Sequence, residues 1–449
     1  MGAIVDGLVG ISQYLPEIKK SEKEIPFSQK MIWTIFALVI FLVMSKIMLF
    51  GLASGVGQNE DLATAQLLLA SEIGTIITAG IGPIVMASIF LQLFLGAQIL
   101  KLDIHAPEGR AKFQQLQKIL AVLLCFIEAF IYVAGGLIVP SPGMLWLVVL
   151  QIAFGSLILL YLDELVSKYG IGSGISLFIA AGVSAGLFWN VFRFPIGEIL
   201  QGGIIYNFIF ESPGNWILLL PLLGVLAIFL AVVFAEGMHV NIPITMGYKG
   251  TGGRYPVKFL YVSNMPVILA MALFMNVRMW AMFFEKVPIL GQLAGGLSWA
   301  VATPSIGGMT LVQGIVVQGI NSVTILAIVQ AVIFLILLII ACVVFGWFWV
   351  QMGNQSTEAV AAQLEKSGMQ IPGFRRDKRV IEKVLGRYIP PITILGSIFV
   401  ALLAGGGDLV LGGIASGTGI LLTVGIIYRF YEEIAKSQSD LLASILGKM

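Results

Sequence analysis

The chain has 449 residues, of which 58% are hydrophobic and only 11% are charged, and its formal net charge is +2. A soluble domain is about 45–50% apolar and about 25% charged, so this composition excludes an ordinary soluble protein. The two cysteines, Cys125 and Cys342, lie inside apolar segments and give neither a disulfide framework nor a metal-ligand spacing.

Ten apolar segments, most of them near the length that a helix needs to cross a bilayer, predict an all-α polytopic membrane protein. The predicted spans are residues 31–50, 75–97, 119–139, 144–162, 171–191, 216–235, 259–277, 324–350, 389–406 and 412–431. A charged segment, 1–30, precedes them and lacks the short apolar region and cleavage site of a signal peptide.

Positive charge is distributed unequally between the two sides of these spans. All but four of the 26 Lys and Arg residues lie in the loops of one side or in the two ends of the chain. Cytoplasmic loops carry an excess of Lys and Arg, so both ends, 1–30 and 432–449, are expected in the cytoplasm. One of the four exceptions, Lys46, falls inside the first predicted span.

Ten spans divide into halves of five, 31–191 and 216–431, joined by an external linker at 192–215. An odd number of spans in each half requires the second half to be inverted relative to the first, as in many transport proteins. The second span of each half contains a small or polar residue, a proline and a short apolar run, in GIGPIVMAS (80–88) and SNMPVILAMA (263–272). Pro and Gly are also frequent in ordinary membrane helices, so this pattern alone leaves the repeat open.

Residues 58–72, QNEDLATAQLLLASE, fit neither a span nor a simple loop. Asn59 suits a helix N-cap, and Glu60 and Asp61 suit the positive end of a helix dipole. The apolar run is too short to cross the bilayer. We expect a short helix that re-enters the mouth of the membrane domain or lies on its surface.

Motifs for enzymatic chemistry are weak in this sequence. His105 and His239 both fall in predicted cytoplasmic loops, which argues against an intramembrane Ser-His protease. GGGD at 405–408 matches the GxGD pattern of aspartyl proteases, but no predicted span has an interior Asp, so we expect a glycine-rich turn on the outer side. No phosphate-binding loop occurs. We therefore predict no catalytic residue, no cofactor and no metal site.

Ionisable residues inside the spans are few, and Glu128 in the third span is the clearest. Such a residue is a functional candidate by default, although a structural hydrogen-bonding role explains it equally well. A small-molecule secondary transporter with an inverted repeat is the alternative function. It is disfavoured because ion-coupled transport uses several polar relay groups within the membrane.

Several stretches resemble the SecY family of protein-translocation channels, in its archaeal and eukaryotic form. They are LDELVSKYGIGSGISLFI (162–179), GIGPIV (80–85) with LQLFLGA (91–97), YPVKFLYVSNMPVIL (255–269) and SGTGILLTVGIIYRFYE (416–432). The resemblance implies an hourglass-shaped pore between the two halves, with a ring of apolar side chains at its waist, a plug helix and a lateral gate into lipid. It also implies that the chain is a channel subunit and not an enzyme.

On this resemblance the pore ring consists of Ile81, Val85, Ile171, Ile175, Met265 and Leu422. The first two pairs are each four residues apart, which is compatible with one helix face per pair. A narrow apolar ring excludes ions by dewetting. Met265 replaces the branched aliphatic residue that is usual in the family, and its flexible thioether can still fill the gap.

The resemblance also implies a plug, a gate and a docking surface. The plug is segment 58–72, with Asn59, Glu60, Asp61, Leu67, Leu68 and Leu69. The lateral gate contains Gln92, Glu128 and Asn264, and its polar cluster is reduced because Met86 stands where the family usually has Thr. The cytoplasmic loops 236–258 and 351–388 would dock ribosomes through Lys249, Arg254, Arg375 and Arg376. A basic loop suits ribosomal RNA phosphates, but positive-inside bias with anionic lipid contact explains the same charges.

The implied partners are a SecE-like subunit and a small beta subunit in a heterotrimer. A ribosome, a nascent chain with a signal sequence and membrane lipids complete the expected surroundings, with the chain in the plasma membrane.

Overall fold

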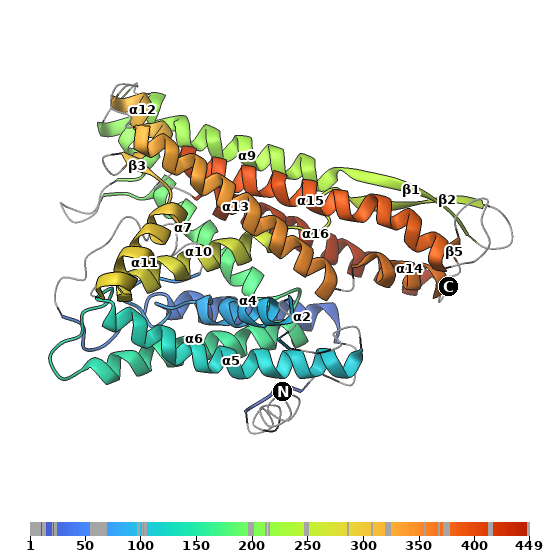
Figure 1. Cartoon of the computed structure of the whole chain (residues 1–449), viewed down its shortest axis with the longest axis horizontal. Helices are drawn as coiled ribbons and strands as arrows, with labels where there is room; N and C mark the ends of the chain where they lie inside the picture. Colours follow the sequence, from blue (N-terminus) through green and yellow to red (C-terminus); the bar gives the residue numbers. More distant parts are fainter. Residues whose placement is uncertain are drawn as a thin grey trace.

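The structure is a computed structural model of the whole chain (Figure 1). It describes residues 10, 15–19, 21, 25–53, 70–96, 99–100, 102, 106–195, 202–211, 213, 216–246, 251–284, 287–306, 309–318, 325–353, 355–366, 369–370, 378–411 and 416–446.

Ten helices occupy the ten predicted spans, so the chain is an all-α polytopic membrane protein. The first half contains α2 (Phe27–Met44), α4 (Gly82–Gly96), α5 (Pro107–Ala134), α6 (Leu145–Tyr169) and α7 (Gly174–Phe192). The second half contains α9 (Leu220–Gly237), α10 (Met265–Phe284), α13 (Ile325–Met352), α15 (Lys378–Leu411) and α16 (Gly417–Leu446). Eight helices in the described ranges are long and apolar enough to cross a bilayer, whereas α4 is shorter and α16 is charged in its later turns.

The two halves repeat the same pattern of neighbours. The first helix of each half packs on the fourth and fifth, the second on the third, and the third on the fourth. Between the halves, the second helices α4 and α10 contact each other, and the fifth helices α7 and α16 contact each other. We call this boundary between the halves the seam. Equivalent helices are expected to meet there when two inverted five-helix halves surround a central pore.

Two helices begin or end at residues other than the bounds of the predicted spans. Helix α2 ends at Met44, so Lys46 lies outside the helix, where its Nζ pairs with Glu72 Oε1 at 3.0 Å. The second span is helical only from Gly82, because residues 70–81 form tight turns in which Gly74 and Gly80 have positive φ. That backbone conformation favours glycine and breaks the helix before the proline at position 83.

The expected glycine-rich turn at residues 405–408 does not form. Helix α15 runs through these residues to Leu411, and Asp408 is buried within the helix. Gly407 packs against Gly417 of α16, where a Cβ on either residue would come within 2.7 Å of the other backbone. The glycines therefore serve close helix packing, as small residues commonly do in membranes.

The loops 236–258 and 351–388 add a small sheet to the helical bundle. Strands β1 (His239–Met246) and β2 (Thr251–Lys258) form an antiparallel hairpin, which places His239 in a strand. Strand β5 (Met369–Gln370) pairs with β1 through Thr245 and Met246. The sheet therefore joins loop 236–258 to loop 351–388, although the paired strands β1 and β5 lie more than 100 residues apart in the sequence.

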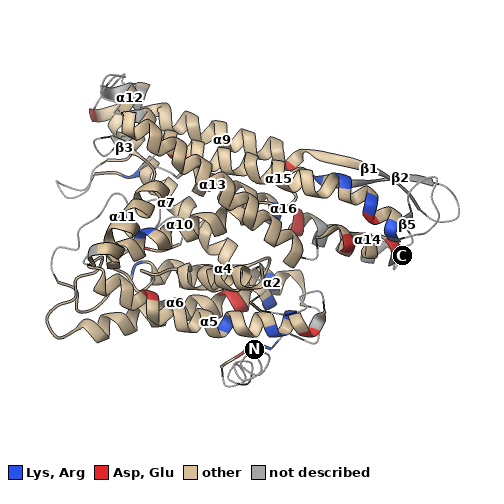
Figure 2. Cartoon of the chain, viewed as in Figure 1, with Lys and Arg blue, Asp and Glu red and all other residues tan. Residues whose placement is uncertain are grey.

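Shorter elements lie at the two ends of the bundle. The linker 192–215 contains α8 (Ile204–Tyr206) and a π-helical turn at Asn207–Glu211, and a 3₁₀ turn, Trp216–Leu219, precedes α9. Between α10 and α13 lie α11 (Pro288–Val301), β3 (Ser305–Ile306), β4 (Met309–Thr310) and α12 (Leu311–Gln318), and α14 (Thr357–Lys366) follows α13. Lys and Arg gather at the end with α14 and the sheet of β1, β2 and β5, and are sparse at the end with α11, α12 and β3 (Figure 2).

An ion-pair cluster fastens the N-terminal segment to the first half. Glu164 on α6 binds Lys118 of α5 and Lys168 of its own helix, each at 2.8 Å. Ile18 donates its N–H to Glu164 Oε1 at 3.2 Å, and Lys118 Nζ donates to the Pro16 carbonyl at 2.6 Å. Because Glu164 and Lys118 are mostly buried, this cluster is screened less than a surface ion pair.

Candidate functional site

Five of the six predicted ring residues belong to one large apolar cluster that spans both halves. Ile81, Val85 and Leu422 are buried in it, and Ile175 and Met265 are partly buried against it. Ile81 lies in the turn before α4, and Val85 lies in α4 itself. Ile175 lies in α7, Met265 is the first residue of α10, and Leu422 lies in α16. The two halves contact each other through these helices, α4 with α10 and α7 with α16, and additionally through α5 and α10. The cluster therefore closes the seam between the halves with apolar side chains.

The sixth ring residue, Ile171, is buried outside that cluster as far as the described residues show. It lies in the turn between α6 and α7, and its N–H donates to Thr34 Oγ1 of α2 at 3.0 Å. Thr34 Oγ1 in turn donates to the Lys30 carbonyl at 2.9 Å. Thr34 thus fixes the backbone at Ile171, a contact that the sequence pattern does not reveal.

A cavity of about 330 Å³ lies directly against Val85, Ile175 and Met265 of the ring. Residues of both halves line it, on α4, α5, α7, α10 and α13. It extends toward the basic end of the bundle, since Arg110 near the start of α5 and Met352 at the end of α13 belong to its wall. A partly polar chamber therefore adjoins three of the predicted ring residues.

Helix α5 contributes a stripe to this chamber that sequence reasoning missed. Arg110, Phe113, Gln114 and Gln117 all line the cavity. Their separations of three and four residues place them on one helix face. The signal was present in the sequence, because polar residues at this spacing occur just before an apolar span.

The three predicted gate residues are all buried, but they make separate contacts. Gln92 Nε2 donates to Ser88 Oγ on its own helix at 3.0 Å. Asn264 Nδ2 donates to the Leu421 carbonyl of α16 at 3.2 Å. Asn264 therefore faces the neighbouring helix of its own half, and no hydrogen bond joins the three gate residues within the described chain.

Each gate residue keeps at least one oxygen atom without a hydrogen-bond partner among the described residues. These atoms are Gln92 Oε1, Asn264 Oδ1 and both carboxylate oxygens of Glu128. Glu128 is only 2% exposed, and burying an unpaired acceptor is unfavourable. Helices α4 and α5, which carry two of these residues, both contact α10 of the other half.

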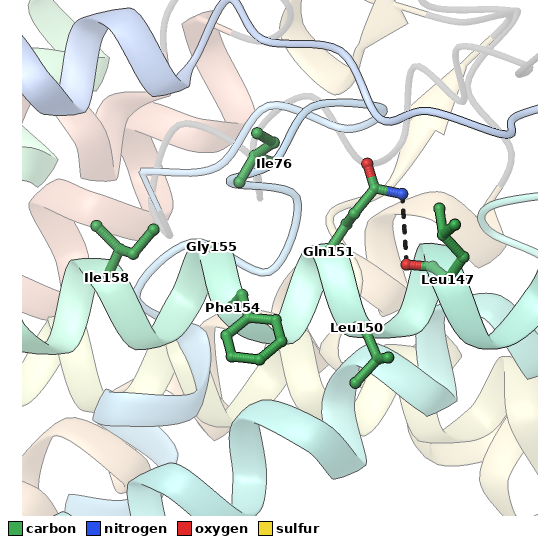
Figure 3. A pocket seen from close by; sticks show the side chains of 7 residues that line it. All are labelled: Ile76, Leu147, Leu150, Gln151, Phe154, Gly155 and Ile158. Carbon is green, nitrogen blue, oxygen red and sulfur yellow. Dashed lines mark hydrogen bonds between the residues drawn. The ribbon is translucent and has the colours of Figure 1, made fainter.

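A second cavity, of about 470 Å³, lies away from the ring on α6 (Figure 3). Ile76, Leu147, Leu150, Phe154 and Ile158 give it an almost wholly apolar wall. Its polar residue, Gln151, is already engaged, because its amide exchanges hydrogen bonds of 3.0 and 2.9 Å with the Phe50 backbone. Exposed apolar side chains surround this groove, so it belongs to the lipid-facing surface.

Several predicted residues lie outside the part of the chain that the structure describes. They include all six named plug residues, Asn59, Glu60, Asp61, Leu67, Leu68 and Leu69, and the docking residues Lys249, Arg375 and Arg376. Arg254 is placed only by its backbone, opposite Pro243 in the β1–β2 hairpin. Within the described residues, no group of three or more His, Cys, Asp or Glu side chains could hold a metal ion.

The geometry defines a polytopic helical membrane protein of two inverted halves, whose seam is filled with apolar side chains beside a chamber lined by both halves. The sequence model of the SecY family matches residues 75–431. The chain belongs to the SecY family.

Known relatives agree over nearly the full length of the chain. "Protein translocase subunit SecY" of Methanothermobacter thermautotrophicus is 43% identical, and the match covers 96% of this chain and 97% of that protein. A solved structure described as "The plug domain of the SecY protein stablizes the closed state of the translocation channel and maintains a membrane seal" has a TM-score of 0.80 and 40% identity, covering 96% of this chain and 97% of the other. "Sec61 in the Canine ribosome-channel complex from the endoplasmic reticulum" has a TM-score of 0.79 and 39% identity, with the same coverage.

Proposed function

We propose that this chain is the protein-conducting channel subunit of a Sec-type protein translocase. It passes unfolded secretory polypeptides across the membrane and releases transmembrane segments sideways into lipid. The observation that carries this function is the single apolar cluster in which α4, α7, α10 and α16 of two inverted halves meet beside a chamber lined by both halves. The translocase and channel relatives support it, and they do not favour the alternative of a small-molecule transporter.

In this proposal the six ring residues are the seal of the resting channel. Small or polar side chains at Ile81, Val85, Ile175 and Leu422 would hydrate the constriction and raise resting ion conductance. Planar-bilayer recordings of the reconstituted complex test this with a Gly substitution at all four positions. A matched control replaces four lipid-facing residues, Leu147, Leu150, Phe154 and Ile158, in the same way. Equal resting conductance in the parent and the ring variant would refute the seal.

Passage of a polypeptide is tested separately by crosslinking. A photoreactive residue at Ile175 should crosslink to a stalled nascent chain, because this residue borders both the ring and the chamber. The same residue at Phe154, which is 55% exposed on the lipid-facing surface, serves as the control. A nascent chain that crosslinks equally at both positions would contradict a central pore.

The gate and the plug are further parts of the proposal. Gln92, Glu128 and Asn264 would open the seam near α4, α5 and α10 toward lipid. Segment 58–72 would plug the pore, and its deletion over residues 60–70 should leave a folded channel with greater transient ion flux. The SecY structure whose plug is described as maintaining a membrane seal supports this assignment. Failure of the deletion variant to fold would show a structural role instead.

The docking surface would receive a ribosome at Lys249, Arg254, Arg375 and Arg376. Two observations support one combined surface: β1 pairs with β5, and the segments that hold Lys249 and Arg375 follow directly after the paired strands. The ribosome-bound Sec61 relative supports the kind of partner. We further propose a SecE-like subunit and a small beta subunit as partners, the plasma membrane as the location, and both termini on the cytoplasmic side.

A further inference from the structure

Asp408 near the end of α15 receives hydrogen bonds from the beginning of the next helix. Its Oδ1 accepts from Ser416 Oγ at 2.8 Å and from the Thr418 N–H at 3.1 Å. Its Oδ2 accepts from Thr418 Oγ1 at 2.6 Å, and the Gly417 N–H also bonds to the carboxylate. The side chains of Asp408, Ser416 and Thr418 are all buried. The carboxylate therefore caps the first turn of α16.

Asp163 near the end of α6 makes the same set of contacts with α7. Its Oδ1 accepts from the Ile175 N–H at 2.8 Å. The Ser173 hydroxyl and the Gly174 N–H also bond to this carboxylate. The carboxylate therefore caps the first turn of α7.

The two constellations occupy equivalent places in the inverted halves. In each half an Asp of the fourth helix accepts from the Ser hydroxyl, the Gly N–H and the next N–H at the beginning of the fifth helix. All the partners are donors, so both carboxylates act purely as acceptors, and the positive end of a helix dipole favours a negative charge there. Because the halves are inverted, one cap lies at each end of the bundle.

The glycines leave little room for these helix starts to move. A Cβ on Gly174 would lie 2.5 Å from the Asp163 Cα, and a Cβ on Gly417 would lie 2.3 Å from the Gly407 Cα. Each cap also lies close to a ring residue in the chain. Ile175 itself donates to Asp163, and Leu422 follows Thr418 by four residues, about one helical turn.

We propose that Asp163 and Asp408 are equivalent positioning residues, one in each half, which hold the first turns of α7 and α16 so that Ile175 and Leu422 remain in the seal. The inference rests on the proposed function, because it assigns the ring as the seal. It extends that function by naming the groups that fix the ring from outside it.

The test measures local exposure and conductance in the full-length chain with its native cysteines replaced by Ala. A cysteine is placed at Leu422 or at Ile175, and its labelling by a charged thiol reagent is timed in the parent, in Asp408→Asn and in Asp163→Asn. We expect Asp408→Asn to speed labelling at position 422 about tenfold and Asp163→Asn to speed labelling at position 175 by a similar factor, as loss of a hydrogen bond to a charged group predicts. Each substitution should leave the other position unchanged, and each should raise resting conductance.

The matched control is Thr393→Val on α15, which removes a buried hydroxyl that donates to the Ile389 carbonyl of its own helix. It should change neither labelling nor conductance. Where an Asp→Asn variant does not fold, Ser416→Ala or Ser173→Ala removes one donor, keeps the carboxylate and should give a smaller change at the same position.

Labelling at the parent rate in the folded variants would overturn the proposal. Faster labelling at both positions in every variant would overturn it as well, since that result indicates loosening of the whole helical bundle and not release of one helix start. If the ring variant conducts ions but the Asp variants stay closed, the positioning role fails while the proposed seal survives. If the ring variant itself stays closed, the proposed seal fails, and the position-specific labelling still decides whether the two carboxylates hold their helices.

Discussion

Gly425 on α16 offers a sharp test of how tightly the second half is packed next to the ring. A Cβ at this position would lie 1.9 Å from Asn264 Nδ2, 2.9 Å from its Cγ and 3.3 Å from its Oδ1. Ordinary contact begins at 3.4 Å, so Gly425→Ala forces Asn264 or α16 to move by about 1.5 Å. Movement of Asn264 also breaks its hydrogen bond to the carbonyl of Leu421, the residue before Leu422 of the proposed ring.

The magnitude follows from these two effects. Overpacking costs about 1–3 kcal/mol, and loss of one hydrogen bond costs about 1 kcal/mol, so Gly425→Ala should cost about 2–4 kcal/mol in the closed arrangement. If the open arrangement escapes the clash, even 2 kcal/mol raises the ratio of open to closed channels roughly 30-fold. We therefore expect a clear rise in resting conductance and a lower thermal midpoint.

The assay combines planar-bilayer conductance with thermal unfolding of the detergent-solubilised complex. Asn264→Ala removes the clashing atoms, so the double variant should conduct less at rest than Gly425→Ala alone. Gly406→Ala on α15 is the control, because its Cβ meets no atom within 4 Å in the structure. Parent-like conductance and stability in Gly425→Ala, unchanged by Asn264→Ala, would refute the reasoning.

Three further substitutions test other parts of the structure. Gly155→Ala would place a Cβ 1.9 Å from the Ile76 carbonyl oxygen, and because a backbone atom cannot rotate away, it should destabilise the protein by about 3 kcal/mol in thermal unfolding. Glu164→Gln removes the charge that binds two lysines, and should weaken attachment of the N-terminal segment by about 1–2 kcal/mol, seen as faster limited proteolysis there. Reversal of Arg375 and Arg376 to Glu should lower ribosome affinity about tenfold or more in cosedimentation, with a shallower salt dependence.

Each of these substitutions has its own control. Gly295→Ala on α11, where a Cβ meets nothing within 4 Å, should leave the thermal midpoint unchanged. For Glu164→Gln, high salt should bring the proteolysis rate of the parent closer to that of the variant, because salt screens the ion pairs. Equal proteolysis rates at low salt would contradict the anchoring role of Glu164. Reversal of the basic pair Lys19 and Lys20 controls for charge alone, and if it weakens ribosome binding as much as the arginine reversal does, docking at residues 375–376 is wrong.

The ten spans could be predicted from the sequence because the free energy of transfer into a bilayer is summed over neighbouring residues. A stretch such as 325–352 is mostly apolar and carries no charged residue, and no tertiary contact is needed to make it a span. The ring residues needed more than hydropathy, since a buried Ile or Leu resembles any other apolar residue. They were assigned by resemblance to a family, and the structure brings five of the six into one cluster.

Only the tertiary structure decided where polar groups and glycines find their partners. Asp408 was expected beside an external turn, yet α15 continues past it and its carboxylate caps a different helix. Likewise, β5 joins a hairpin more than 100 residues earlier in the chain. The physical reason is that hydropathy and helix length are properties of a single segment. A hydrogen bond or a glycine contact depends on a second segment, whose position follows from packing of the whole bundle.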